Sequence, residues 1–373
     1  MHSNAAVDRL LEAASRARPD PASLPAALLI YGAGGRGREV RRVLERRGHR
    51  VVGFIDQAGR PGLEIAGLPV WSPDAAEPRA ANAAGAHVAI GIFRHDADIA
   101  QIAASLTARG FSDVVSFLDV YRHYPDDFPG TFWLGPAEPL AASADAIRRA
   151  FGLLGDAQSR RVFVECLKMR VEADVSVLRA PDRSAQYIPS DVVALTTPQR
   201  WVDGGAFDGD TVRALRTAQV PLSAVAAFEP DPANYAKLVE TAGADPLVDY
   251  ALFPCGLWSS STQLRFQADG GDGARIGSEG TSVIQCVTLD ACLPNFRPTF
   301  IKLDVEGAEP EALIGARQTI ARHRPTLAVS AYHQPDHLWS LIHAIDALEL
   351  GYRFELRHHG FLHFDVVLYA LPT

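Results

Sequence analysis

The stretch WVDGGAFDGDT (201–211) constrains the fold more than any other part of the chain. A short apolar strand leads to Asp203, a glycine-rich segment runs to Gly209, and Asp210-Thr211 favour the start of a helix. Glycines in such a strand-to-helix turn let the backbone pass close beneath a ligand where a Cβ atom would collide. The helix N-terminus directs free N–H groups at the same ligand. The stretch therefore predicts a ligand-binding turn at one edge of a sheet.

Two further strand ends belong to the same predicted pocket. The apolar run 224–228 ends in Glu229, and the run TFIKLDVEG (299–307) contains a strand that ends in Asp304. An acid at the tip of the second strand is placed to accept hydrogen bonds from both ribose hydroxyls of an adenosine cofactor. Ligands of open α/β sheets lie at the carboxyl ends of the strands. The three strand ends therefore predict one cofactor pocket.

Three motifs carry a resemblance to a known family: VDGGAFDGDT (202–211), FEPDPANY (228–235) and IKLDVEGAEPEALIGA (301–316). Together they resemble the FkbM family of S-adenosylmethionine-dependent methyltransferases. The resemblance implies a class I methyltransferase fold, with a mainly parallel sheet completed by antiparallel final strands near 352–359 and 364–371. It also implies S-adenosylmethionine as the cofactor. The residues expected to border the cofactor are Asp203, Gly204, Gly205, Ala206, Phe207, Gly209, Asp210, Thr211, Glu229, Asp231, Gly256, Leu257, Asp304 and Tyr187.

A second glycine turn lies near the beginning of the chain. The buried strand 26–31 is followed by Gly32, Gly34 and Gly37 in a G-x-G-x-x-G pattern, and Asp56 comes 19 residues after the last glycine. This spacing fits a dinucleotide-binding fold. Residues 26–120 resemble the N-terminal Rossmann-like domain of sugar acyltransferases of the PglD and NeuD type, which implies a nucleotide-sugar ligand. Arg36 is the candidate phosphate contact, and the alternative is a domain that packs or docks without a ligand.

The length of 373 residues fits two domains. We expect an N-terminal helix or arm at 1–25, a Rossmann-like domain at 26–125, a linker and helical collar at 126–195, and the methyltransferase domain at 196–373. The predicted fold class is α/β, with two Rossmann-like domains in tandem. The glycine-rich loop 269–280 is a hypothetical substrate gate.

Composition limits the partners and the compartment. The formal net charge of -8 argues against a nucleic-acid partner. No apolar run approaches the roughly 18 residues of a membrane span, and charged residues interrupt the place of a signal peptide. The four cysteines form no C-x-x-C pair, which favours reduced thiols in a cytoplasmic enzyme. The oligomeric state stays open.

The candidate catalytic residues are His333, Asp304 and Glu306. His333 follows the predicted fifth strand, and an imidazole that titrates near pH 6.5 suits proton removal from a hydroxyl. Asp304 is expected to orient that base or to bind substrate, while Glu309 is expected to favour the helix dipole. Tyr187 is expected to cover the methionine end of the cofactor. A divalent metal held by Asp304 with His358, His359 and His363 is a further hypothesis.

The leading functional hypothesis is an O-methyltransferase that acts on a hydroxyl of a sugar, a glycan or another small molecule. One alternative is an NAD(P)-dependent sugar-modifying oxidoreductase that uses the first glycine turn, although the chain has no Tyr-x-x-x-Lys pair. The other is a non-catalytic nucleotide-sugar-binding protein. Binding of S-adenosylmethionine or of NAD would distinguish these classes.

Overall fold

A computed structural model of the chain describes residues 3–16, 23–128, 131–135, 138–177, 186–245, 248–267, 275–276 and 282–373. The chain divides into two compact units. The first comprises 1–144, 161–181 and 360–364, and the second comprises 145–160, 182–359 and 365–373. Most of the loop 269–280 lies outside the described residues, and so does part of the N-terminal arm.

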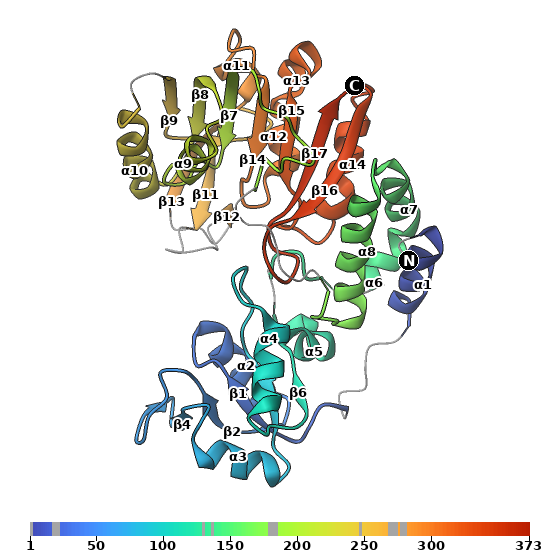
Figure 1. The fold of residues 1–373 in the computed structure, drawn as a ribbon, viewed down its shortest axis with the longest axis vertical. Helices are drawn as coiled ribbons and strands as arrows, with labels where there is room; N and C mark the ends of the chain where they lie inside the picture. The colour runs from blue at the N-terminus through green and yellow to red at the C-terminus, as the bar shows by residue number, and fades with distance from the viewer. Residues whose placement is uncertain are drawn as a thin grey trace. The chain divides into compact units, whose positions relative to one another are not determined.

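The first unit contains a six-stranded sheet in the order β3-β4-β2-β1-β5-β6 (Figure 1). All neighbouring strands are parallel except β3 and β4, which pair antiparallel. The elements are α1 (Asn4–Ala14), β1 (Ala27–Tyr31), α2 (Gly35–Arg46), β2 (Arg50–Ile55), β3 (Glu64–Ile65), β4 (Leu68–Trp71), α3 (Ala76–Ala83), β5 (His87–Ile90), α4 (Ile99–Ala108), β6 (Val114–Val115), α5 (Phe117–His123), the 3-10 helix η2 (Pro125–Asp127) and α6 (Glu138–Ala142).

The second unit contains a seven-stranded sheet in the order β16-β17-β15-β14-β7-β8-β9 (Figure 1). Its elements begin with α7 (Ala144–Leu153) and α8 (Ala157–Glu172), and the unit boundary falls within α8. The others are β7 (Gln199–Gly204), α9 (Asp210–Thr217), β8 (Leu222–Phe228), α10 (Pro232–Gly243), β9 (Asp249–Phe253), β10 (Gly256–Leu257), β11 (Thr262–Gln267), β12 (Arg275–Ile276), β13 (Ser282–Val287), α11 (Leu289–Cys292), β14 (Phe300–Leu303), α12 (Glu309–Gly315), α13 (Arg317–His323), β15 (Thr326–Ser330), α14 (His337–Asp346), β16 (Tyr352–His358) and β17 (Val366–Pro372).

Strand direction confirms the predicted fold class. The strands β9, β8, β7, β14 and β15 are parallel neighbours, whereas β17 pairs antiparallel with β15 and with β16. The apolar-spaced segment after β14 forms two helices, because α12 ends at Gly315 and α13 begins at Arg317. A Cβ at Gly315 would lie 2.0 Å from the carbonyl oxygen of Trp258, so the backbone packs closely at this break.

The centre of the sheet is apolar on both faces, as expected for parallel strands covered by helices. Trp201 of β7 stacks on Phe300 of β14 with ring centroids 3.9 Å apart. Val212 and Leu215 of α9 join the same buried cluster, and so does Leu238 of α10. This packing fixes the central strands, and therefore the positions of the residues that follow their carboxyl ends.

Candidate active site

Four neighbouring strands end at the candidate site. Along the order β8-β7-β14-β15, the chain continues into Glu229, the turn 205–209, Asp304 and the segment that leads to His333. Because parallel strands place their carboxyl ends at one sheet edge, residues from 203 to 333 in the sequence meet there.

The turn after β7 passes so close to β14 that a side chain would not fit at Gly205. Gly205 has a φ of 76°, and a Cβ there would lie 1.9 Å from the carbonyl oxygen of Asp304. Gly209 caps α9 with a φ of 85°, in the left-handed region that glycine favours. Phe207, between them, is half exposed. The turn thus has the close backbone packing that the glycine-rich sequence predicts.

A buried ion pair supports this turn from within the sheet. The Lys302 Nζ lies 2.9 Å from Asp203 Oδ1 and donates a 2.5 Å hydrogen bond to the carbonyl oxygen of Gly205. Burial raises the pKa of the Asp203 carboxyl to about 6, although Lys302 opposes the shift, so the pair is ionised at pH 7. The Asp203 side chain is fully buried, which makes it a support of the turn in this structure.

Glu229 links the turn to the start of α10. Its Oε2 accepts a hydrogen bond from the Phe207 N–H at 2.9 Å, and its Oε1 accepts one from the Asp231 N–H at 2.8 Å. Burial raises the pKa of Glu229 to about 7. The carboxylate of Asp231 caps α10 by accepting from the backbone of Ala233 and Asn234. Two backbone donors therefore hold the Glu229 carboxylate beside the turn, and its predicted contact with ribose stays a prediction.

Asp304 connects the turn to a second group of polar residues. Its N–H donates to the carbonyl oxygen of Gly204 at 3.0 Å, and its Oδ2 accepts a 2.7 Å hydrogen bond from the Tyr187 hydroxyl. Tyr187 is buried, and Lys302 Nζ lies 5.3 Å from the centre of its ring. The structure thus places Tyr187 on Asp304. Its predicted role as a cover for the cofactor stays a prediction.

His333 lies among three carboxylates. Its Nδ1 is 2.8 Å from Glu309 Oε1, and its Nε2 is 3.4 Å from Asp304 Oδ1 and 3.6 Å from Glu306 Oε2. Glu309 also accepts a hydrogen bond from the Val305 N–H, so its side chain is fixed. All three predicted catalytic residues, His333, Asp304 and Glu306, are therefore brought together.

The charge around His333 changes one expectation. Burial alone would lower the pKa of His333, but Glu309, Glu306 and Asp304 raise it to about 10. The pKa near 6.5 expected for His333 belongs to an isolated imidazole and does not apply beside these carboxylates.

The remaining predicted cofactor residues lie along the same edge. Ala206 and Thr211 are buried in the turn and in the first turn of α9, and Asp210 accepts a hydrogen bond from the Thr211 N–H at 2.8 Å. Gly256 and Leu257 form β10, and the Leu257 side chain packs beside Gly204.

The predicted metal group of Asp304 with three C-terminal histidines is not formed among the described residues. His359 Nε2 lies 2.9 Å from the Tyr369 hydroxyl, and His363 lies 3.2 Å from Arg170 Nε in the first unit. In the part of the chain that the structure describes, the group with metal-ligating spacing is instead Asp304, Glu309 and His333.

The N-terminal glycine turn has the predicted shape, but Arg36 has other partners. A Cβ at Gly37 would lie 1.9 Å from the carbonyl oxygen of Gly32, so α2 packs tightly on the turn, and Gly34 caps α2. Asp56 accepts hydrogen bonds from the Ala33 and Ala58 N–H groups at 2.8 and 2.9 Å.

The Arg36 guanidinium pairs with Glu39 and lies 5.0 Å from the ring centre of Phe117. Its predicted phosphate contact stays a prediction.

The sequence analysis missed Lys302 and His337, and it assigned Glu309 only to the helix dipole. Lys302 stands between Ile301 and Leu303 in an otherwise apolar strand, and a lysine in that setting signals a buried ion pair. Glu309 is fully buried, and His337 Nδ1 lies 3.3 Å from its Oε2. The four-residue spacing of His333 and His337 was the sequence signal that could have placed both histidines at the site.

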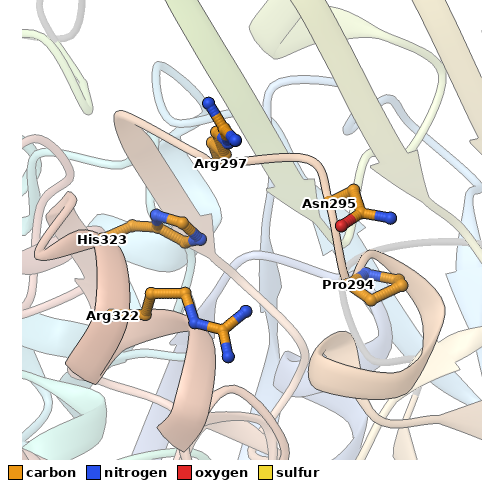
Figure 2. A pocket seen from close by; sticks show the side chains of 5 residues that line it. All are labelled: Pro294, Asn295, Arg297, Arg322 and His323. Carbon is orange, nitrogen blue, oxygen red and sulfur yellow. The ribbon is translucent and has the colours of Figure 1, made fainter.

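A surface pocket in the same unit lies elsewhere. Figure 2 shows its lining residues, which are Pro294, Asn295, Arg297, Arg322 and His323. These residues precede β14 and β15, so the pocket lies where the two strands begin, at the sheet edge opposite the candidate site.

None of the helices in the described ranges combines the length and the apolar content needed to cross a bilayer. No curated protein sequence matches the chain. Two family models match: the methyltransferase FkbM domain at residues 203–356 and the PglD N-terminal domain at residues 27–95.

The fold agrees with that of a solved structure. The crystal structure of methyltransferase FkbM from Methylobacillus flagellatus KT matches with a TM-score of 0.78 and 22% identity, over 98% of this chain and 97% of that one. Fibrillarin from Aeropyrum pernix, solved with bound S-adenosyl-L-methionine, gives a TM-score of only 0.33 at 12% identity, over 50% of this chain and 73% of its own. A score this low establishes no shared fold. The chain therefore carries a domain of the methyltransferase FkbM type at residues 203–356, preceded by a domain of the PglD N-terminal type at residues 27–95.

Proposed function

We propose that the chain is an S-adenosylmethionine-dependent O-methyltransferase that acts on a hydroxyl of a sugar or glycan. The observation that carries the proposal is the position of Glu229, which two backbone N–H groups hold beside the glycine turn. A carboxylate offers about four lone-pair sites, so two hydrogen bonds leave capacity for the two ribose hydroxyls. The close approach of Gly205 to Asp304 leaves the turn without a side chain at that point. The residues present therefore fit the cofactor.

When bound, S-adenosylmethionine supplies an activated methyl group: the sulfur–methyl bond breaks, an oxygen–methyl bond forms, and the hydroxyl proton leaves. Asp304, Glu306 and His333 lie directly beyond β14 and β15, next to the turn. Their task is to orient the acceptor hydroxyl and to take up or relay its proton. The match of residues 27–95 to the PglD N-terminal domain supports a sugar-bearing acceptor.

Calorimetry with the full chain tests the cofactor. We expect one S-adenosylmethionine per chain, and weaker binding by about 1–3 kcal/mol in Glu229→Ala because charge-assisted hydrogen bonds to ribose are lost. Glu240→Ala, an exposed acid on α10, is the matched control. Uptake of NAD without S-adenosylmethionine would favour the oxidoreductase alternative. Uptake of a nucleotide sugar alone would favour a non-catalytic binding protein.

The acceptor is then sought by measuring S-adenosylhomocysteine release with a panel of sugars, nucleotide sugars and small polyketide alcohols. A binding-competent chain that methylates an amine or a carboxylate in place of a hydroxyl would contradict the O-methyltransferase assignment.

A further inference from the structure

Two carboxylate oxygens lie near the same ring nitrogen of His333. His333 Nε2 lies 3.4 Å from Asp304 Oδ1 and 3.6 Å from Glu306 Oε2. One donor atom from each of Asp304, Glu309 and His333 also lies within 4.8 Å of the other two. We propose that this cluster is a divalent-cation site in which Asp304 Oδ1, Glu306 Oε2 and His333 Nε2 are the protein ligands.

The separations suit a bound ion better than hydrogen bonds. Donors about 2.1 Å from one ion lie about 3.0 Å apart at octahedral angles and about 3.4 Å apart at tetrahedral angles. A nitrogen–oxygen hydrogen bond is typically about 2.9 Å long. His333 is nearly fully buried, and its Nε2 makes no hydrogen bond in the described part of the structure. A cation bound between Nε2 and these two carboxylates would give the buried nitrogen a partner.

The next layer of residues orients these ligands. Glu309 Oε1 lies 2.8 Å from His333 Nδ1 and is itself fixed by the Val305 N–H, so the imidazole presents Nε2 to the cluster. The Tyr187 hydroxyl holds Asp304 Oδ2, which turns Oδ1 toward His333. Carboxylate–histidine–metal arrangements of this kind fix the tautomer and the ring orientation of the ligating histidine.

The negative charge of the cluster also favours a bound cation. Asp304, Glu306 and Glu309 bring three carboxylates together, while the nearby Lys302 already pairs with Asp203. Gathering several carboxylates at one place is costly unless cations or hydrogen bonds compensate for their repulsion. One imidazole with two carboxylates suits a transition cation of the Mn²⁺ to Zn²⁺ range more than Ca²⁺, which prefers oxygen ligands only.

The inference rests on the proposed function, which gives the cation its role in the reaction. Asp304 links the two, because it belongs to this cluster and its backbone also packs against the glycine turn. A cation here would hold the acceptor oxygen and favour loss of its proton. Cation binding at the site, however, can be measured without S-adenosylmethionine or an acceptor.

The experiment uses the full chain, stripped with a chelator and titrated with Mn²⁺ alone. Electron paramagnetic resonance counts the free ion, and spin-echo modulation detects a nitrogen ligand on the bound ion. We expect one Mn²⁺ per chain with an imidazole nitrogen signal, and that signal should vanish in His333→Ala. Asp304→Asn should weaken binding at least tenfold, and Glu309→Gln about 10- to 100-fold.

Two controls keep the result interpretable. His323→Ala and Glu311→Gln remove the same residue types outside the cluster and should leave the titration unchanged. Thermal melts of every variant check folding. Absence of Mn²⁺ uptake by the folded wild-type chain would overturn the inference, and so would bound Mn²⁺ without a nitrogen signal.

Calorimetry with S-adenosylmethionine on the same chelated sample separates the two proposals. Cofactor binding without Mn²⁺ uptake rejects only the cation site. Mn²⁺ uptake without cofactor binding rejects the proposed function and keeps the site.

Discussion

Tyr187 donates a 2.7 Å hydrogen bond to Asp304 Oδ2 across 117 residues of sequence. Tyr187 adopts a φ of 70°, in the left-handed region that a bulky side chain rarely occupies. Such backbone strain persists where surrounding structure enforces it and concentrates at functional sites. The pairing ties the segment before β7 to the end of β14, and with it to the cluster around His333.

Tyr187→Phe removes only this hydroxyl. We expect the turnover rate to fall by about 10- to 100-fold, because a hydrogen bond to a charged group contributes about 1.5–3 kcal/mol. The affinity for S-adenosylmethionine should stay within about twofold, since Glu229 is untouched. Tyr235→Phe, which removes a hydroxyl that donates to the Leu252 carbonyl oxygen, is the matched control. Equal turnover in wild type and Tyr187→Phe would exclude a role for the pairing in catalysis.

Lys302→Met should destabilise the chain by about 3–5 kcal/mol, because it leaves Asp203 as a buried charge without its partner. Urea unfolding measures this loss. The double variant Asp203→Asn with Lys302→Met should recover part of it, since the unpaired charge is gone. The exposed Lys237→Met serves as control. If the single and double variants unfold alike, the ion pair does not support the turn in the way described.

The glycine turns and the mainly parallel sheet were predictable from the sequence because apolar runs, glycines and terminal acids act locally. Glu229 is an example: its place after an apolar strand predicted a position at the sheet edge, where the structure has it. The partners of His333 were not predictable in the same way. The contacts of Glu309 and Tyr187 with the cluster depend on where α12 and the segment before β7 return to the sheet, and no local pattern encodes that.

The break between α12 and α13 shows the same limit. The apolar spacing of 309–322 continues through it, and the close contact of Gly315 with Trp258 interrupts the helix. A tertiary contact of this kind overrides helix propensity.

Cofactor affinity should depend on pH through Glu229, whose pKa burial raises to about 7. The groups that face its carboxylate are the Phe207 and Asp231 N–H groups, Lys302 and the Asp231 carboxylate. Ribose hydroxyls donate to the ionised form, so affinity should tighten as pH rises from 6 to 8 and weaken below pH 7. Calorimetry across this range checks the trend, and Glu229→Gln should show no such dependence.

The same shift has a consequence for stability. The folded state binds the Glu229 proton more tightly than the unfolded state, whose glutamate pKa is about 4.3. The contribution of Glu229 to the free energy of unfolding is therefore full below about pH 4.3 and declines as pH rises toward 7. The difference between wild type and Glu229→Gln in urea unfolding should follow that sign. A difference that grows in favour of wild type with rising pH would contradict it.

Removal of residues 1–144 should leave a chain that still binds S-adenosylmethionine, because Glu229, the glycine turn and Asp304 all belong to the second unit. The excised chain should also expose apolar surface. The segments 161–181 and 360–364 belong to the first unit, where Phe364 packs against Phe93 with ring centroids 4.8 Å apart. Binding of a hydrophobic dye should therefore rise, and Phe364→Ser in the excised chain should reduce it. The same substitution in the full chain is the control and should cost stability. Loss of both folding and cofactor binding on excision would mean that the two units depend on one shared core.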